Sequence, residues 1–129
     1  MDPVVHFEMA FKNRDRMAKF YQSVFSWKTE KLGEEMGHYV LATTTETGKH
    51  GPKKPGAING GFYPQEKGLE QHPTVVISVK DIKKSMKKIK DAGGKVLEKP
   101  MDIPGIGKYV SFKDTEGNRV TMLEPVPMD

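Results

Sequence analysis

One order of secondary structure is predicted twice along this chain, and that repeat constrains the fold more than any other feature. Residues 1–64 and residues 72–125 each predict a strand, a helix and then further strands. The first copy opens on the run Val4–Met9 and the second on Thr74–Val79, and each run leads within a few residues into an amphipathic helix. We therefore expect two helix-and-sheet modules in tandem, with any active site between them.

The length of the chain indicates how these modules are organised. At 129 residues it is close to the usual size of one domain, about 100–150 residues, so neither module is expected to fold alone. We predict one domain over residues 1–129, in which residues 65–71 form a polar linker between the two modules.

Composition excludes several classes of function. No apolar run approaches the roughly 18 residues of a membrane span, and the N-terminus lacks the pattern of a signal peptide, so a cytoplasmic location is expected. Cysteine is absent, which excludes disulfides and thiolate chemistry. Much of the net charge of +4 lies on a predicted helix face, residues 83–90, and in a loop without aromatic residues, residues 49–54. We therefore expect neither a nucleic acid nor a membrane as partner.

Alternation along the first strand separates two faces. Val5, Phe7 and Met9 are apolar and alternate with His6 and Glu8, which is the period of a strand with one buried face. The apolar set is expected to pack under a helix and to leave His6 and Glu8 on the opposite face. In the second module, the helix-facing residues are expected to be Val75, Ile77 and Val79.

Local signals place the other elements. Asn13 and Asp81 are typical N-cap residues, the first helix is expected to end near Ser26-Trp27, and the pair Gly93-Gly94 marks the end of the second helix. The buried stripe of the first helix is expected to consist of Met17, Phe20, Tyr21 and Val24. Further strands are expected at residues 28–32, 38–44, 56–63, 95–98, 109–113 and 119–124, and residues 45–55 are expected to form a loop.

Several motifs together resemble those of one known family. They are His6-Phe7-Glu8, Phe20-Tyr21, Phe25-Ser26-Trp27, Asp91-Ala92-Gly93-Gly94, Asp114-Thr115-Glu116-Gly117-Asn118 and Glu124-Pro125. Through them, nearly the whole chain resembles the vicinal oxygen chelate superfamily of glyoxalase I, bleomycin-resistance and fosfomycin-resistance proteins and extradiol dioxygenases. The resemblance implies an α+β fold in which two tandem βαβββ modules form a curved mixed sheet, a cup of the glyoxalase/bleomycin resistance type. It also implies a homodimer.

The resemblance implies which positions would hold a metal cofactor. Glyoxalase-like members hold a divalent metal with side chains on the first and last strands of each module. His6 falls on the first-strand position and Glu124 on the last-strand position, and their donor atoms suit zinc, nickel, manganese or iron. The matching positions in the other copies are Thr74 and Tyr63, which are not expected ligands. The resemblance therefore leaves open both a metal with a reduced ligand set and no metal at all.

Two neighbouring residues are candidates to complete the chemistry. His72 lies two residues before Thr74, on the same strand face but about 7 Å further along, so as a third ligand it would require a shifted site. Glu8 lies one same-face step from His6, and it is a candidate both for third ligand and for general base. If the alternation holds, the residues that line the cup and contact a small organic ligand are Tyr63, Thr74, Val76, Ser78, Val120 and Met122.

Three functions remain open from the sequence. The first is a metal-dependent lyase, isomerase or dioxygenase in which His6 and Glu124 hold the ion. The second is a metal-free cup that binds and sequesters a small molecule, as bleomycin-resistance proteins do. The third is a metal-independent isomerase or hydrolase with Glu8 as its base.

Overall fold

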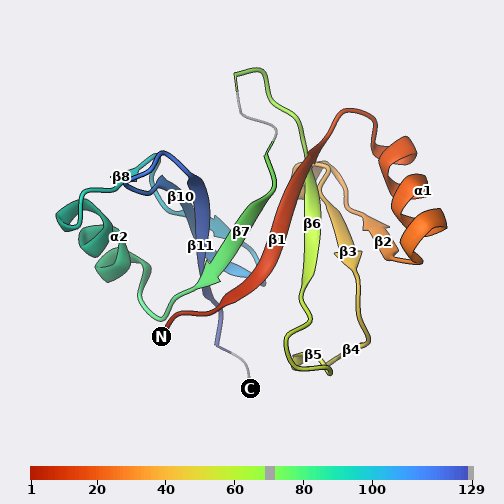
Figure 1. Ribbon diagram of the computed structural model, residues 1–129, viewed down its shortest axis with the longest axis horizontal. Coiled ribbons are helices and arrows are strands. Elements are labelled where there is room, and N and C mark those ends of the chain that lie inside the picture. The colour runs from red at the N-terminus through yellow and green to blue at the C-terminus, as the bar shows by residue number, and fades with distance from the viewer. Residues whose placement is uncertain (69–71, 128–129) are drawn as a thin grey trace. The chain divides into compact units, whose positions relative to one another are not determined.

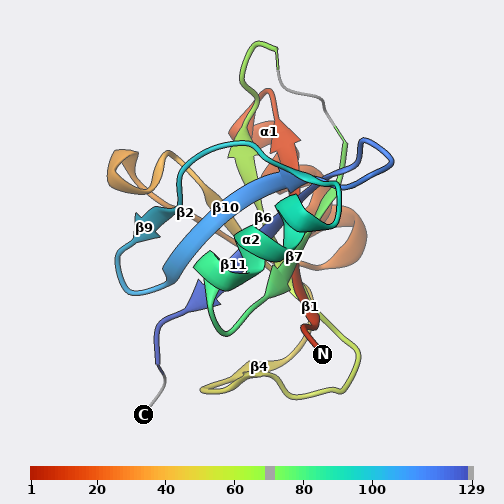
Figure 2. The same ribbon diagram turned by 90° about the vertical axis from the view of Figure 1, so that its left-hand side faces the viewer.

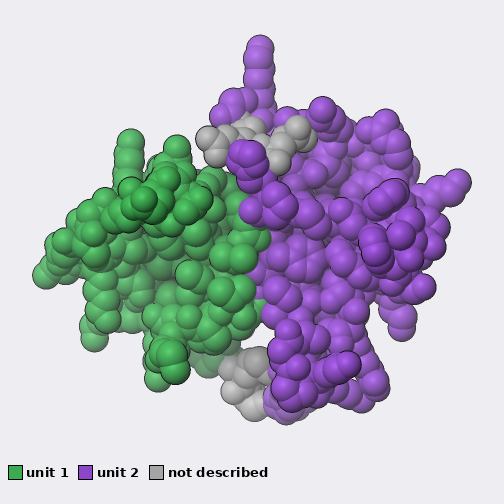
Figure 3. Space-filling view, viewed as in Figure 1, with its two compact units in different colours: residues 1–5, 74–129 green, residues 6–73 purple. Residues whose placement is uncertain are grey.

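Each half of the chain folds as a strand, a helix and further strands, in the order that the repeat predicts (Figure 1). The computed structural model describes residues 1–68 and 72–127, so residues 69–71 of the predicted linker lie outside the described part. The chain divides into unit 1, which comprises residues 1–5 and 74–129, and unit 2, which comprises residues 6–73 (Figure 3). Each unit has one α-helix and a mixed set of parallel and antiparallel strand pairs, which confirms the predicted α+β class.

The strands of unit 2 form a mixed sheet in the order β2-β3-β6-β1. The elements are β1 (Val4–Phe11), α1 (Arg14–Phe25), β2 (Lys28–Lys31), the 3-10 turn η1 (Glu34–Met36), β3 (Val40–Thr43), β4 (Thr47–Gly48), β5 (Gly51–Pro52) and β6 (Asn59–Pro64). Strand β1 runs parallel to β6, and β6 and β2 run antiparallel to β3. The expected loop at residues 45–55 contains a short hairpin of β4 and β5, so that prediction was incomplete.

Helix α1 begins and ends where the sequence predicts. The side-chain oxygen of Asn13 accepts a hydrogen bond from the backbone N–H of Arg16, and Asn13 is extended, as an N-cap residue should be. At the other end, Ser26 has a φ of 60°, and its backbone N–H donates to the carbonyl of Gln22. Both helix boundaries are thus set by local chemistry.

The core of unit 2 lies between α1 and one face of its sheet. Its buried residues are Val40, Ala42 and Phe62, and the partly buried residues packed against them are Phe7, Met9, Phe11, Met17, Tyr21 and Trp27. The alternation predicted for β1 is therefore confirmed for Phe7 and Met9, and it leaves His6 and Glu8 on the face opposite α1. Val5 is 39% exposed, so the prediction that it packs under the helix was wrong.

The buried stripe of α1 is rotated from the predicted one. Ala18 is 2% exposed, whereas Phe20 and Val24 are 53% and 54% exposed. At 3.6 residues per turn, Phe20 and Val24 lie roughly 200° and 240° around the helix from Ala18. The prediction that Phe20 and Val24 are buried was therefore wrong, because the small side chain of Ala18 faces the sheet.

The strands of unit 1 follow the order β7-β11-β10-β8, with β9 paired to β10. The elements are β7 (Thr74–Ser78), α2 (Ile82–Asp91), β8 (Lys95–Val96), β9 (Met101–Ile103), β10 (Gly107–Lys113) and β11 (Arg119–Pro125). Strand β7 is parallel to β11, and the other pairs are antiparallel. Helix α2 lies across these strands (Figure 2). Among the described residues, no helix is both long enough and apolar enough to cross a membrane.

Helix α2 covers an apolar face of unit 1. Its cluster consists of buried Val79, Ile82, Val110 and Met122, with Ile77, Met86, Ile89, Val96 and Phe112 packed against it. Ile77 and Val79 face the helix as predicted, but Val75 is 40% exposed, so that part of the prediction was wrong. The predicted N-cap is confirmed, since the Asp81 carboxylate accepts the backbone N–H of Lys84.

The register between β7 and β11 corrects one predicted face. Met122 lies beside Ile77, and Thr121 lies beside Val76. Because side chains alternate along a strand, Met122 faces α2 while Val76 and Thr121 face the other way. The sequence prediction placed Val76 and Met122 on one face, and that was wrong. Val120 shares the side of Met122 by the same alternation.

Candidate functional site

Three polar side chains of unit 2 form one hydrogen-bonded group, which we call the His6–Tyr39–Glu8 cluster. The Tyr39 hydroxyl donates to Glu8 Oε2 at 2.8 Å, and His6 Nε2 lies 3.0 Å from the same hydroxyl oxygen. A hydroxyl has one proton, and here it goes to Glu8, so the bond from His6 requires a proton on Nε2. The group is therefore a chain of donors that ends on a carboxylate.

The backbone conformation before β3 positions Tyr39 for these hydrogen bonds. Gly37 and His38 have φ values of 65° and 57°, so two successive residues adopt the left-handed conformation before β3. The carbonyl of Tyr39 then accepts the backbone N–H of Leu32 at 2.8 Å. These contacts fix where the tyrosine leaves the turn.

A pair of glycines in β6 makes room on both faces of the sheet. A Cβ on Gly61 would overlap the ring of Tyr39, and a Cβ on Gly60 would overlap the ring of Phe7. Gly61 is paired with Glu8 across the parallel strands, so Tyr39 lies over the backbone beside the carboxylate that it binds. The close approach of Tyr39 to the sheet thus requires glycine at this position.

Burial sets the charge of the histidine. Removal from water lowers the pKa of His6 below its ordinary value of 6.5. The imidazole is therefore neutral at pH 7, which agrees with a ring that donates from Nε2. A neutral donor supports the Tyr39 hydroxyl without adding positive charge beside Glu8.

Tyr63 supplies an unusual polar group on the same face. It follows Gly61 by two residues in β6 and so shares the side of Glu8, which pairs with Gly61. Its hydroxyl oxygen is buried and has no hydrogen-bond partner among the described residues. Buried polar atoms nearly always have a hydrogen-bond partner, so a bound ligand can supply the partner that this hydroxyl lacks within the described part of the chain.

Unit 1 has its own polar group on the face opposite α2. Ser111 Oγ and Thr121 Oγ1 are 3.1 Å apart, and an Arg119 guanidinium N–H donates to Ser111 Oγ. Thr74 and Val76 are buried, and Ser78 is half-buried. The sequence interpretation missed Ser111 and Thr121, although both alternate with apolar neighbours in their strands.

Glu124 has a structural partner. Its Oε1 accepts the backbone N–H of Ile82, the first residue of α2, at 3.0 Å. A carboxylate at this end of a helix satisfies an otherwise unpaired N–H and interacts favourably with the helix dipole. Glu124 thus caps α2 from a distant strand.

The donor groups do not fit a divalent metal. Within the described part of the chain, no group of three or more His, Asp or Glu side chains could hold an ion. His6 Nε2 and Glu8 Oε2 both bind the Tyr39 hydroxyl, and Glu124 binds a backbone amide. His72 is exposed, ahead of β7. We therefore derive no chemical step through a metal, and the roles predicted for His6, Glu124 and His72 as ligands stay predictions.

Comparison with known proteins identifies a family. The family model described as Glyoxalase/Bleomycin resistance protein/Dioxygenase superfamily matches residues 4–122. Two mycobacterial proteins named "Putative glyoxylase CFP32", from Mycobacterium bovis and Mycobacterium tuberculosis, are 31% identical over 70 residues, which are 54% of this chain and 27% of theirs. The chain thus spans about a quarter of the length of these curated relatives.

Solved structures show the same fold. A methylmalonyl-CoA epimerase in complex with methylmalonyl-CoA and NH4+ has a TM-score of 0.71 at 17% identity, over 100% of this chain and 98% of that one. A methylmalonyl-CoA epimerase from Mycobacterium tuberculosis has a TM-score of 0.65 at 14% identity, over 96% and 88%. These likenesses confirm the predicted fold of paired βαβββ modules.

Proposed function

This chain belongs to the Glyoxalase/Bleomycin resistance protein/Dioxygenase superfamily, and on that premise we propose that it is an enzyme acting on a small organic molecule. The reaction is abstraction of a proton from the carbon next to a carbonyl group, with Glu8 as the base. The observation that carries this proposal is the His6–Tyr39–Glu8 cluster, a carboxylate held in place by a donor chain.

The cluster holds Glu8 in a fixed orientation for proton abstraction. Tyr39 fixes the carboxylate through Oε2, and His6 in turn fixes the hydroxyl of Tyr39. A carboxylate has about four acceptor sites, so the bond from Tyr39 is compatible with further bonds to the same group. Because the supporting groups are already bonded to each other, little reorganisation is needed when the reaction starts.

Tyr63 is proposed to stabilise the product of that step. Loss of the proton places negative charge on the carbonyl oxygen, and a donor already aimed at that oxygen lowers the barrier. The Tyr63 hydroxyl is buried, lacks a partner among the described residues, and lies on the same sheet face as Glu8. Its proton can be donated to the developing oxyanion without breaking a bond seen among those residues.

The comparisons support the reaction class only indirectly. Several solved structures with this fold are epimerases of an acyl-CoA ester. Identities of 14–17% carry the fold alone, so the substrate of this chain is proposed only as a carbonyl compound with an acidic neighbouring carbon.

Solvent exchange tests the proposal without knowledge of the product. Acyl thioesters, 2-hydroxycarbonyl compounds and 2-oxo acids are incubated with the protein in D2O, and NMR follows loss of the proton next to the carbonyl. We expect at least one compound to exchange, and Glu8→Gln to slow that exchange by about 10²-fold or more. Glu30→Gln, at an exposed carboxylate of β2, is the matched control and should leave the rate unchanged.

The outcomes separate the candidate functions. If Glu8→Gln exchanges as fast as wild type, Glu8 is not the base. If exchange is lost on chelation, restored by zinc, nickel, manganese or iron and lost again in His6→Ala, the metal-dependent function replaces the one proposed here. An equal loss of exchange in Glu30→Gln would indicate that the substitutions disturb the fold and do not act by removing the base.

A metal-free binding protein is the second candidate. The Tyr63 hydroxyl, which lacks a partner among the described residues, favours it, because such a group binds a polar ligand atom whether or not a reaction follows. Thr74, Val76 and Ser78 stay proposed ligand contacts of unit 1. A compound that binds with one-to-one stoichiometry, binds less well to Tyr63→Phe and never exchanges its proton would favour sequestration over catalysis.

A further inference from the structure

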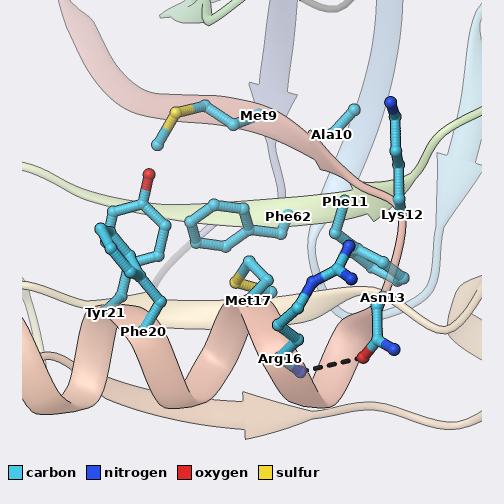
Figure 4. Close-up of a pocket in the computed structure, with 10 residues that line it drawn as sticks. All are labelled: Met9, Ala10, Phe11, Lys12, Asn13, Arg16, Met17, Phe20, Tyr21 and Phe62. Carbon is cyan, nitrogen blue, oxygen red and sulfur yellow. Dashed lines mark hydrogen bonds between the residues drawn. The ribbon is translucent and has the colours of Figure 1, made fainter.

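A pocket of unit 2 lies on the opposite side of the sheet from the His6–Tyr39–Glu8 cluster. It is open to solvent, has a volume of about 400 Å³, and lies between the C-terminal end of β1 and helix α1 (Figure 4). This volume is within the range of about 300–1,000 Å³ that small-molecule sites have. Its size therefore suits a ligand, and its position separates it from the proposed site of proton abstraction.

Flexible and aromatic side chains form most of the walls. Met9 and Phe62 come from the sheet, and Met17, Phe20 and Tyr21 come from α1 (Figure 4). Phe20 is 53% exposed although its ring packs edge-on against Tyr21, with the centroids 5.1 Å apart. Thioether and aromatic groups adapt to apolar ligands of different shape. The walls thus favour an apolar ligand body.

Positive charge lies at one end of this pocket. Lys12 and Arg16 both line it (Figure 4), and neither forms an ion pair within the described part of the chain. The neighbouring Asp15 does not compensate for them, because its carboxylate is paired with Lys31. Two cations beside an apolar wall attract a ligand that carries both an anionic group and an apolar body.

We propose that this pocket binds a small amphiphilic anion, a monocarboxylate whose hydrocarbon part lies on Met9, Met17 and Phe20 and whose carboxylate meets Lys12 and Arg16. The proposal is independent of the reaction proposed for Glu8. It assigns a second ligand site to unit 2, on the helix-covered face of the sheet.

Three probes of equal chain length separate charge from apolar contact. Octanoate, octanol and octyltrimethylammonium are titrated below their micellar concentrations, with binding followed by calorimetry and by amide NMR shifts. We expect octanoate to bind most tightly and to shift the signals of residues 9–21 and 62. Octanol should bind more weakly, and the cation most weakly of the three.

Matched variants locate the site. Lys12→Gln and Arg16→Gln should each weaken octanoate binding by about two- to fivefold, the factor of an exposed ion pair, and should leave octanol binding unchanged. Lys19→Gln, at an exposed lysine of α1 outside the pocket, is the charge control. Phe20→Ala should weaken both ligands by about fivefold, which corresponds to loss of about 40 Å² of apolar contact. Phe25→Ala, at a phenylalanine 58% exposed on the same helix, is the apolar control.

Several results would overturn the proposal. One is equal affinity for octanoate and octanol, which removes the role of the charges. Another is equal weakening in the control variants, which indicates a general surface effect. Absence of octanoate binding at millimolar concentration, or shifts confined to the opposite face of the sheet, would also refute the site.

Discussion

Replacing Tyr63 by phenylalanine should stabilise the free protein and weaken its ligand binding. The Tyr63 hydroxyl is buried without a hydrogen-bond partner among the described residues, and such a group costs about 1–3 kcal/mol of folding free energy. Phenylalanine keeps the ring and removes the unpaired group, so we expect the free energy of unfolding to rise by roughly 1 kcal/mol. For a chain of this length, that raises the melting temperature by roughly 3–5 °C.

Tyr39→Phe is the control, because it should change the free energy of unfolding in the opposite direction. Its hydroxyl makes hydrogen bonds to His6 and to Glu8, and the second of these ends on a carboxylate. Loss of both bonds should lower the free energy of unfolding by about 2–3 kcal/mol. Urea denaturation at pH 7 and thermal melts measure both variants. Destabilisation of Tyr63→Phe by more than about 1 kcal/mol would refute the idea that its hydroxyl is unpaired.

Three further changes test other parts of the structure. Glu124→Gln should lower the free energy of unfolding by about 1 kcal/mol, because the N-terminus of α2 loses a charged acceptor; an unchanged urea midpoint would contradict this. Gly61→Ala should expel Tyr39 from its place over the sheet and so reduce both stability and any exchange activity, whereas Gly48→Ala, where an added Cβ would meet only the flexible side chain of Lys53, is the control. Asp114→Asn should be less stable than wild type at pH 7, and the difference should shrink in acid. Hydrogen bonds from Asn118, Glu116 and Gly117 lower the pKa of Asp114 below its ordinary value of 3.8, so the charged form is the one that folding favours. Its contribution is therefore present above about pH 4 and is lost as the pH falls through the folded pKa; denaturation curves between pH 2 and pH 7 that stay parallel would contradict it.

Local signals in the sequence predicted the helix boundaries and the β1 alternation well. Asn13 and Asp81 cap helices through their own side chains, which is chemistry that a few neighbouring residues decide. The face of β11 was assigned wrongly for the opposite reason. The prediction assumed that Glu124 points into the cup as a metal ligand and assigned the rest of the strand by alternation. In the structure, the pairing of Met122 with Ile77 sets the face, and this pairing joins segments that are distant in the sequence.

Tyr39 was the main residue of the candidate site that the sequence interpretation missed. It is 31 residues from Glu8 and 33 from His6, and only the pairing of β3 with β6 and of β6 with β1 brings the three together. One signal was available, because Gly37-His38-Tyr39-Val40 matches Gly107-Lys108-Tyr109-Val110 in the second module. That match indicates a tyrosine placed after a glycine turn, but not its partners.

The protonation of the His6 ring tests most directly whether the His6–Tyr39–Glu8 cluster is a hydrogen-bonded base or a metal site. Long-range proton–nitrogen NMR at pH 7 distinguishes the two ring nitrogens, and the spectrum is recorded before and after zinc is added. We predict a neutral ring with its proton on Nε2 in both spectra, bonded to the Tyr39 hydroxyl. A ring whose Nε2 carries no proton, or gives it up to bind zinc, would contradict the assignment of Glu8 as a metal-independent base.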